Sequence, residues 1–113
     1  MANQVQKLVN ATQWLPANIR AKAISKIFGN VVPLVGTAGL VYEELTPERV
    51  VVSIRNRRKV QNHIKNVHAA AMALLAETAT GMVVGMNVRD DCLPLAKELK
   101  MAFKKRATGA LRA

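Results

Sequence analysis

A long stretch of small and apolar residues, from His68 to about Gly85, constrains the fold more than any other feature of this chain. Its spacing predicts a helix, and its many alanines suit a helix that other elements approach closely on several sides. The stretch holds one carboxylate, Glu77, and two histidines stand at its entrance, His63 and His68. Because a buried carboxylate is costly unless it is hydrogen-bonded or neutralised, these polar groups need a reason.

The periodicity of apolar residues predicts the other elements. Spacings of three and four residues indicate amphipathic helices before the long helix, and alternation of apolar and polar residues indicates strands on both sides of it. One long helix packed on an antiparallel sheet is an α+β arrangement. The predicted elements are one or two helices within residues 1–29 (the second from Pro16 to Gly29 and Asn30), a loop over 31–36, strands over 37–45 and 49–56, a loop over 87–94, a strand over 98–105 and the start of another strand at 110–113.

The length of 113 residues suits one domain with a real core. Residues 1–29 are expected to form an N-terminal helical segment, and residues 30–113 the main domain. Because the chain stops where the last predicted strand opens, we expect the final strands of the sheet to be missing from it.

The chain is strongly basic, with 17 lysines and arginines against 7 acidic residues and a net charge of +10. Such a charge predicts a polyanionic partner, such as a phosphorylated cofactor, nucleic acid or an anionic membrane, unless the basic surface is merely solvated. None of the aromatic residues is interleaved with the basic clusters, so there is no platform on which bases could stack. Apart from the positive charge of the chain, nothing in the sequence therefore favours nucleic acid as the partner.

Other features of the sequence indicate the cellular compartment of the protein. Cys92 is the single cysteine, which excludes an intrachain disulfide and suits a reducing interior. The N-terminus lacks a signal-peptide pattern, and Glu77, Thr78 and Thr80 interrupt the longest apolar stretch, which argues against a membrane span. We therefore expect a cytoplasmic protein. The histidines and Cys92 match no familiar metal-ligand spacing, so no metal site is predicted.

The spacing of the polar groups limits how they can cooperate. His68 and Glu77 lie on one predicted helix, where about 100° and 1.5 Å per residue place them roughly half a turn and about 13 Å apart. One helix cannot bring them into one site, so a site that uses both must be shared between two chains, most simply across a two-fold axis. Glu77 either faces solvent, caps nearby backbone or acts as a general base.

Asn62, His68 and Glu77 fall at the spacing of the motif Asn-x-x-Gly-x-x-His-Gly-Gly, which is followed by an acidic residue inside the helix. With this motif the sequence resembles the hotdog-fold thioesterases, most closely their uncharacterised bacterial thioesterase-like branch. Residues 93–111 also look like the strand of that family and its F-x-x-x-A-x-G turn. The resemblance covers roughly residues 17–113 and implies a hotdog fold, in which an antiparallel sheet wraps a long helix.

The resemblance implies roles for individual residues. Glu77 would activate water or attack the thioester carbonyl, and the backbone N–H of Ala69, which replaces the usual glycine, would bind the developing oxyanion. Asn62 would position the water or the thioester from the opposite subunit, and His68 would support the loop and the substrate. First-turn N–H groups suit this task because they lack partners within their helix.

The basic clusters then have a candidate ligand in coenzyme A, which would be part of the substrate rather than a separate cofactor. The phosphates of coenzyme A would attract these basic side chains. Basic turns that are simply exposed to solvent explain the same clusters equally well. The cations are Arg57, Arg58, Lys59, Lys104, Lys105 and Arg106. The resemblance thus implies a hydrolase of acyl-CoA or acyl-carrier thioesters that works as a dimer or tetramer. A non-catalytic module that binds an acyl group or CoA and, more weakly, a nucleic-acid-binding protein remain alternatives.

Overall fold

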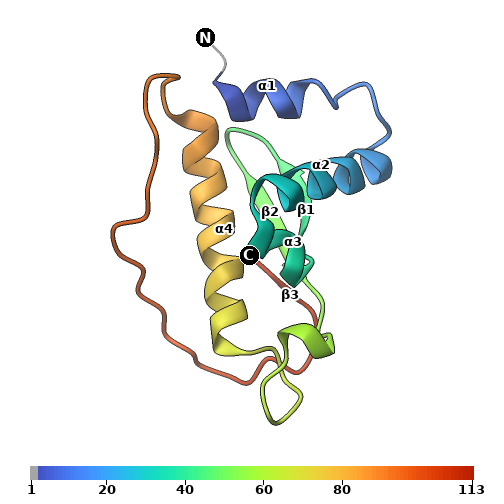
Figure 1. Cartoon of the computed structure of the whole chain (residues 1–113), viewed down its shortest axis with the longest axis vertical. Helices are drawn as coiled ribbons and strands as arrows, with labels where there is room; N and C mark the ends of the chain where they lie inside the picture. The colour runs from blue at the N-terminus through green and yellow to red at the C-terminus, as the bar shows by residue number, and fades with distance from the viewer. Residues whose placement is uncertain (1–2) are drawn as a thin grey trace.

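Helices and strands occupy most of the chain up to residue 87. The computed structural model describes residues 3–113 (Figure 1). The long helix beside an antiparallel sheet confirms the predicted α+β class. The helices are α1 (Gln4–Asn10), α2 (Ala17–Val31), α3 (Pro33–Ala38) and α4 (Ala69–Asn87), with a short 3-10 helix η1 (Arg58–Val60), and the strands are β1 (Val41–Leu45), β2 (Val50–Ile54) and β3 (Leu111–Arg112).

The sheet is three-stranded and antiparallel, in the order β1–β2–β3. β1 and β2 form a hairpin, and β3 adds to the other edge of β2. This arrangement confirms the strand predicted over 49–56 and the strand start at 110–113, because β-branched alternation marks half-buried strands. The strand predicted over 37–45 is confirmed only from Val41 to Leu45, since Thr37 and Ala38 belong to α3. The pairs that set the register include Leu45 with Val50, Tyr42 with Val52, and Ile54 with Leu111.

α4 packs on β2 and supplies much of the core. Its buried residues recur at three- and four-residue spacing, so one face of the helix meets the sheet. The helix predicted from His68 to about Gly85 is confirmed, with His68 as its N-cap and Asn87 as its last residue. The core residues on this face include Ala71, Leu75 and Ala79, which join Val52 and Ile54 of β2.

Within the described part of the chain, one helix, α4, is long and apolar enough to cross a membrane. The core helix of a water-soluble protein meets the same criterion, so this property is weak evidence by itself. The packing on β2 buries one face of α4, and 28% of its apolar stretch is buried inside the chain.

α2 packs on β1 and shares the same core. Ile24 and Phe28 are its buried residues, and the Phe28 ring lies 5.2 Å from the ring of Tyr42. The amphipathic helices predicted within residues 1–29 are confirmed, and Pro16 is the N-cap of α2. The predicted end at Gly29 and Asn30 is wrong, because the hydrogen-bonded helix continues to Val31.

The loop predicted over residues 31–36 is also wrong, because a further short helix, α3, forms there. Pro33 begins this helix, since its fixed φ suits the first helical position. Gly39 ends it in a left-handed conformation with φ of 71°. α3 folds back closely on α2, and a side chain on Gly36 would overlap the carbonyl oxygen of Gly29.

Residues 88–110 contain no helix or strand, and in Figure 1 they run past α4 opposite the sheet. The strand predicted over 98–105 is therefore wrong in the single chain. A strand needs a neighbouring strand for its backbone hydrogen bonds, and no strand within residues 3–113 pairs with the segment. Two of its apolar side chains, Leu99 and Phe103, are 48% and 51% exposed.

Candidate functional site

A tight turn that carries Asn62 leads into α4. The Oδ1 atom of Asn62 accepts hydrogen bonds from the backbone N–H groups of Ile64 (3.0 Å) and Asn66 (3.1 Å). Lys65 adopts a left-handed conformation with φ of 62° within the turn. Asparagine suits such turns because its side chain can bond backbone groups a few residues on. The side-chain oxygen of Asn62 thus shapes the turn, while its side-chain NH2 group has no hydrogen-bond partner within residues 3–113.

His68 caps the start of α4, where the backbone N–H of Ala69 stays unpaired within residues 3–113. Its Nδ1 atom accepts the N–H of Ala70 at 2.9 Å, and its own N–H donates to Val60 O at 2.8 Å. The Ala69 N–H lies at the positive end of the helix dipole, where an unpaired N–H can polarise a carbonyl oxygen.

A hollow of about 340 Å³ opens at this end of α4, and we call it the entrance hollow. It forms because residues 103–107 lie against the start of the helix, where Val67 N–H donates to Ala107 O at 2.9 Å. The hollow thus brings a free backbone donor, an amide and three cations together. Its lining includes Asn62, Ala69, Phe103, Lys104, Lys105 and Arg106.

Glu77 lies half-buried in the middle of α4, in a second hollow of about 550 Å³ that we call the Glu77 hollow. Most of its lining is apolar and comes from α3, α4 and residues 93–99. Tyr42 and Thr78 are two further polar residues in the lining. Burial, and then the negative charge of Glu77, raises the pKa of Tyr42 to about 12. Thr78 Oγ1 is buried and has no hydrogen-bond partner in the described part of the chain.

The predicted site residues therefore fall into two groups. Asn62 and Ala69 line the entrance hollow, whereas Glu77 lines the other one, and neither hollow contains both Ala69 and Glu77. His68 contacts the helix start through its cap but lines neither hollow. One chain does not bring the predicted catalytic groups together.

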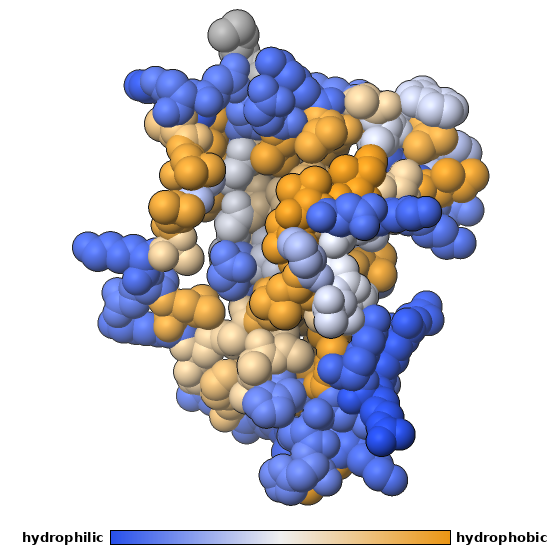
Figure 2. Space-filling model, viewed as in Figure 1, coloured by the Kyte–Doolittle hydropathy of each residue, from blue (hydrophilic) through white to orange (hydrophobic). Residues whose placement is uncertain are grey.

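The second predicted cationic cluster, Arg57 to Lys59, lies on and beside η1. All three side chains are exposed. The segment that carries them lies at the same end of the molecule as the turn before α4 (Figure 1), and this end is largely hydrophilic (Figure 2). None of the three side chains lines the entrance hollow. The Nζ atom of Lys59 lies next to Gly39, so this side chain extends toward the end of α3.

The sequence patterns identify neither Tyr42 nor Thr78 as site residues. The one sequence feature that could have drawn attention to Thr78 is that it directly follows Glu77. The sequence does not show whether the hydroxyl of a helical threonine has a hydrogen-bond partner. Tyr42 belongs to a predicted strand, and its approach to Glu77 depends on how β1 and α4 pack in three dimensions.

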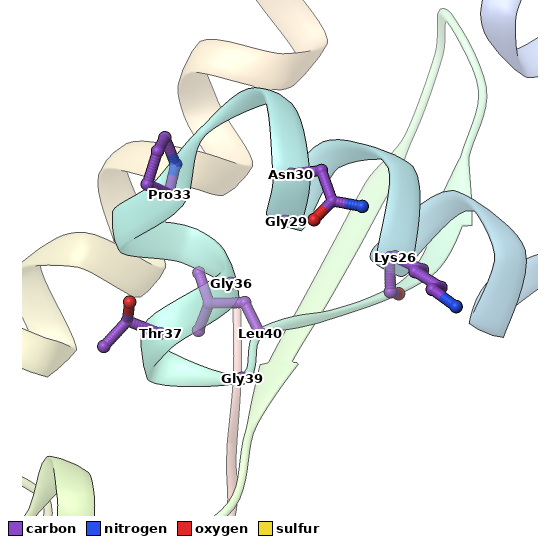
Figure 3. Close-up of a pocket in the computed structure, with 9 residues that line it drawn as sticks. Lys26, Gly29, Asn30, Pro33, Gly36, Thr37, Gly39 and Leu40 are labelled. Carbon is purple, nitrogen blue, oxygen red and sulfur yellow. The ribbon is translucent and has the colours of Figure 1, made fainter.

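A larger hollow of about 680 Å³ lies between α2 and α3 (Figure 3). Its polar side chains include Lys26, Asn30 and Thr37, and it contains none of the predicted site residues. Within residues 3–113, no group of histidine, cysteine, aspartate or glutamate side chains is placed to hold a metal ion.

Comparison with known proteins places the chain in a family. Residues 20–113 match the sequence pattern of a family described as "Domain of unknown function (DUF4442)". The chain belongs to the DUF4442 family. A solved structure described as "Crystal Structure of genomics APC5556" superposes on this DUF4442 chain with a TM-score of 0.77 and 24% identity, covering 96% of this chain and 71% of the other. At that identity the likeness concerns the fold alone. No curated protein matches the chain.

The DUF4442 chain thus carries two chemically different hollows along α4. The entrance hollow offers hydrogen-bond donors and positive charge, which suit an anionic or polarised oxygen. The Glu77 hollow offers a carboxylate in a mostly apolar setting, which suits proton transfer beside an apolar group.

Proposed function

We propose that this DUF4442 chain is a hotdog-fold hydrolase of acyl-CoA or acyl-carrier thioesters whose active site is shared between two subunits. The observation that carries the proposal is the pair of half-sites on α4: a free Ala69 N–H beside cations, and Glu77 in an apolar hollow. The packing of a long helix on an antiparallel sheet supports the hotdog assignment, as does the resemblance of the motif around Asn62.

The proposed mechanism uses each half-site once. The Ala69 N–H of one subunit donates to the thioester carbonyl oxygen and stabilises the negative charge that develops there. Glu77 of the other subunit takes a proton from water as the water attacks the carbonyl carbon, or attacks that carbon itself. The carbon–sulfur bond then breaks, and in the first route the thiolate takes up the proton that Glu77 accepted. In the second route the acyl group remains on Glu77 as a mixed anhydride, which water hydrolyses to the free acid and the regenerated carboxylate, and the thiolate takes up the proton released. The Asn62 amide orients the water or the thioester, while His68 holds the helix start in position.

Oligomer formation is part of this proposal. Residues 98–105 have the alternation of a strand, and in the single chain no strand pairs with them. Pairing with a second subunit would satisfy those backbone groups and cover the exposed faces of Leu99 and Phe103. A dimer, or a tetramer built from two dimers, is therefore the proposed active form.

The phosphates of coenzyme A would meet the cations around the entrance hollow. Lys104, Lys105 and Arg106 line that hollow directly, so a thioester that enters it must pass them. Arg57, Arg58 and Lys59 stand at the same end of the molecule and would add longer-range attraction. No separate cofactor is required by this chemistry.

Replacement of Glu77 tests the enzymatic proposal. A panel of acyl-CoA substrates is assayed with the parent chain, Glu77→Ala and Glu77→Gln, and we expect both variants to lose about 100-fold or more in kcat/KM. Glu98→Ala is the matched control, because Glu98 lines the same hollow but is exposed and pairs with Lys100 at 3.3 Å. Hydrolysis by Glu77→Ala at the parental rate would overturn the role of this carboxylate.

A non-catalytic module that binds an acyl group or CoA is the second candidate. The observation that favours it is that Asn62 Oδ1 and His68 Nδ1 are both engaged in local bonds that shape the turn and the cap. This candidate predicts that the parent chain binds CoA but hydrolyses none of the panel, and that Glu77→Ala binds CoA as tightly as the parent does.

A further inference from the structure

The lower end of the molecule in Figure 1, which is largely hydrophilic in Figure 2, carries many lysines and arginines, and we call it the basic end. It consists of residues 55–66, which include η1 and the turn before α4, together with residues 103–108. Its lysines and arginines are Arg55, Arg57, Arg58, Lys59, Lys65, Lys104, Lys105 and Arg106, all of them exposed.

No acidic residue neutralises the basic end. The sequence has no aspartate or glutamate between Glu48 and Glu77 or after Glu98. The ion pairs within residues 3–113 all use other cations, so the charge of this end is available to a partner. Those pairs are Arg49 with Glu44, Arg89 with Asp91, Lys100 with Glu98, and Arg112 with Glu43.

Hydrogen bonds hold the two parts of the basic end on one surface. Asn56 Nδ2 donates to Lys65 O at 3.1 Å and to Thr108 O at 3.0 Å, so one side chain ties the turn to the later segment. Gln61 Nε2 donates in turn to Asn56 Oδ1 at 2.9 Å. The cations of both parts therefore act together on the same ligand.

Apolar side chains are exposed among these cations. Ile64 stands in the turn between His63 and Lys65 and is 47% exposed, while Phe103 next to Lys104 is 51% exposed. The left-handed conformation of Lys65 closes the turn sharply, which makes this part of the chain protrude. Exposed apolar residues surrounded by lysine and arginine are typical of segments that insert into the interface of a membrane.

We propose that the basic end docks this protein onto the anionic surface of a lipid bilayer. The cations would contact the phosphate and carboxylate groups of the lipids, and Ile64 would enter the interfacial layer beneath them.

A bilayer fits the basic end better than the other polyanions do. Proteins bind single-stranded nucleic acid through several aromatic side chains on which the bases stack. Phe103 is the one aromatic residue at this end. An acidic protein would need a broad complementary surface, whereas the basic end is a narrow projection at one end of the long axis (Figure 1). A fluid bilayer can mould itself around a projection.

Docking would also bring the entrance hollow to the membrane surface, since Lys104 and Arg106 belong to both. Lipid binding does not depend on thioester hydrolysis, because no part of the basic end uses Glu77. Glu77→Ala is therefore expected to bind lipid as the parent does, so the two proposals can fail separately.

Co-sedimentation with vesicles tests the proposal. The parent chain is mixed with vesicles of phosphatidylcholine alone or with added phosphatidylserine, and we expect binding to the second kind, weakened by salt. Arg57→Gln combined with Arg58→Gln should weaken binding at least about tenfold, since each cation near an anionic surface contributes about fivefold. Ile64→Ser should weaken it by up to about tenfold through lost apolar contact.

A matched pair of charge removals provides the control. Lys22→Gln combined with Lys26→Gln removes the same charge from the exposed side of α2, and circular dichroism checks that every variant remains folded. We expect this control to bind vesicles nearly as the parent does. Equal weakening by both pairs would overturn the proposal, because net charge alone would then explain binding. Binding that ignores Ile64→Ser, or that is tighter to an RNA oligonucleotide or an acidic peptide, would overturn it as well.

Discussion

Tyr42 links the core to the Glu77 hollow, and as the one tyrosine of the chain it can be titrated without overlap. Burial raises its pKa to about 12, and the charge of Glu77 adds to that shift. In Glu77→Gln we expect the pKa of Tyr42 to fall but to stay above its ordinary value, because burial is the larger cause. Ultraviolet absorbance of the tyrosinate measures it. An unchanged pKa in Glu77→Gln would contradict the placement of the two groups.

The raised pKa of Tyr42 also predicts how the stability of the protein changes at high pH. The folded-state pKa of Tyr42 lies above the unfolded value of 10.0, so its contribution is complete below pH 10.0 and is lost as pH rises toward about 12. Tyr42→Phe should therefore show a smaller fall in the free energy of unfolding across that window than the parent does. Urea denaturation at several pH values measures the difference.

Thr78 presents a different case, since its buried hydroxyl has no partner in the described part of the chain. Thr78→Val removes that hydroxyl while it keeps the shape of the side chain, so we expect stability to be unchanged or raised by about 1 kcal/mol. Thr78→Ser keeps the hydroxyl and loses the methyl group, which should cost about 1 kcal/mol. Urea denaturation separates them. A loss of more than about 2 kcal/mol in Thr78→Val would show that the hydroxyl is paired in solution.

At the scale of elements, the contact between α2 and α3 depends on two glycines. Alanine at position 36 would gain about 1 kcal/mol from helix propensity, but its Cβ would overlap the carbonyl oxygen of Gly29. Forcing two helices apart costs about 1–3 kcal/mol, so we expect Gly36→Ala to lower the free energy of unfolding. Gly109→Ala is the control, because no atom lies within 4 Å of the added carbon. A Gly36→Ala chain as stable as this control would contradict the close contact.

The helices and strands also show which parts of the fold local sequence patterns can predict. α4, β1 and β2 are predicted correctly because apolar periodicity decides them and the core satisfies it. α3 is missed because it is short and depends on Pro33 and on contact with α2 rather than on periodicity. The strand over 98–105 is predicted from an alternation that is real, but a strand requires a partner, which a periodicity cannot supply.

Some features of the candidate site likewise follow from local sequence, whereas others depend on tertiary contacts. Asn62 and Ala69, which the motif singles out, line one hollow because the turn and the first helical residue are close in sequence. The position of residues 104–106 in the same hollow follows from tertiary contacts such as that of Val67 with Ala107. Tyr42 and Thr78 could not be predicted, because burial and the approach of β1 to α4 determine their chemistry.

For the whole molecule, the separation of Ala69 and Glu77 into two hollows makes the proposed activity depend on assembly. Equal amounts of Glu77→Ala and Asn62→Ala chains, each with little activity alone, should regain activity when they exchange subunits. Half of the dimers would then be mixed, and each mixed dimer has one intact site of two, so about a quarter of the parental activity is expected.

The mixing experiment distinguishes a shared site from a site within one chain. If Asn62 and Glu77 acted within the same subunit, every site in a mixed dimer would carry one defect, and no activity would return. Exchange itself is checked by co-purification of a tagged and an untagged chain, so a negative result is informative only when mixed dimers are present. Phe103→Asp tests pairing directly, because a charge on the exposed face of residues 98–105 should prevent dimer formation while leaving the fold intact. Its readout is molecular size rather than activity, since Phe103 also lines the entrance hollow. An active monomer in size-exclusion chromatography would contradict the shared site.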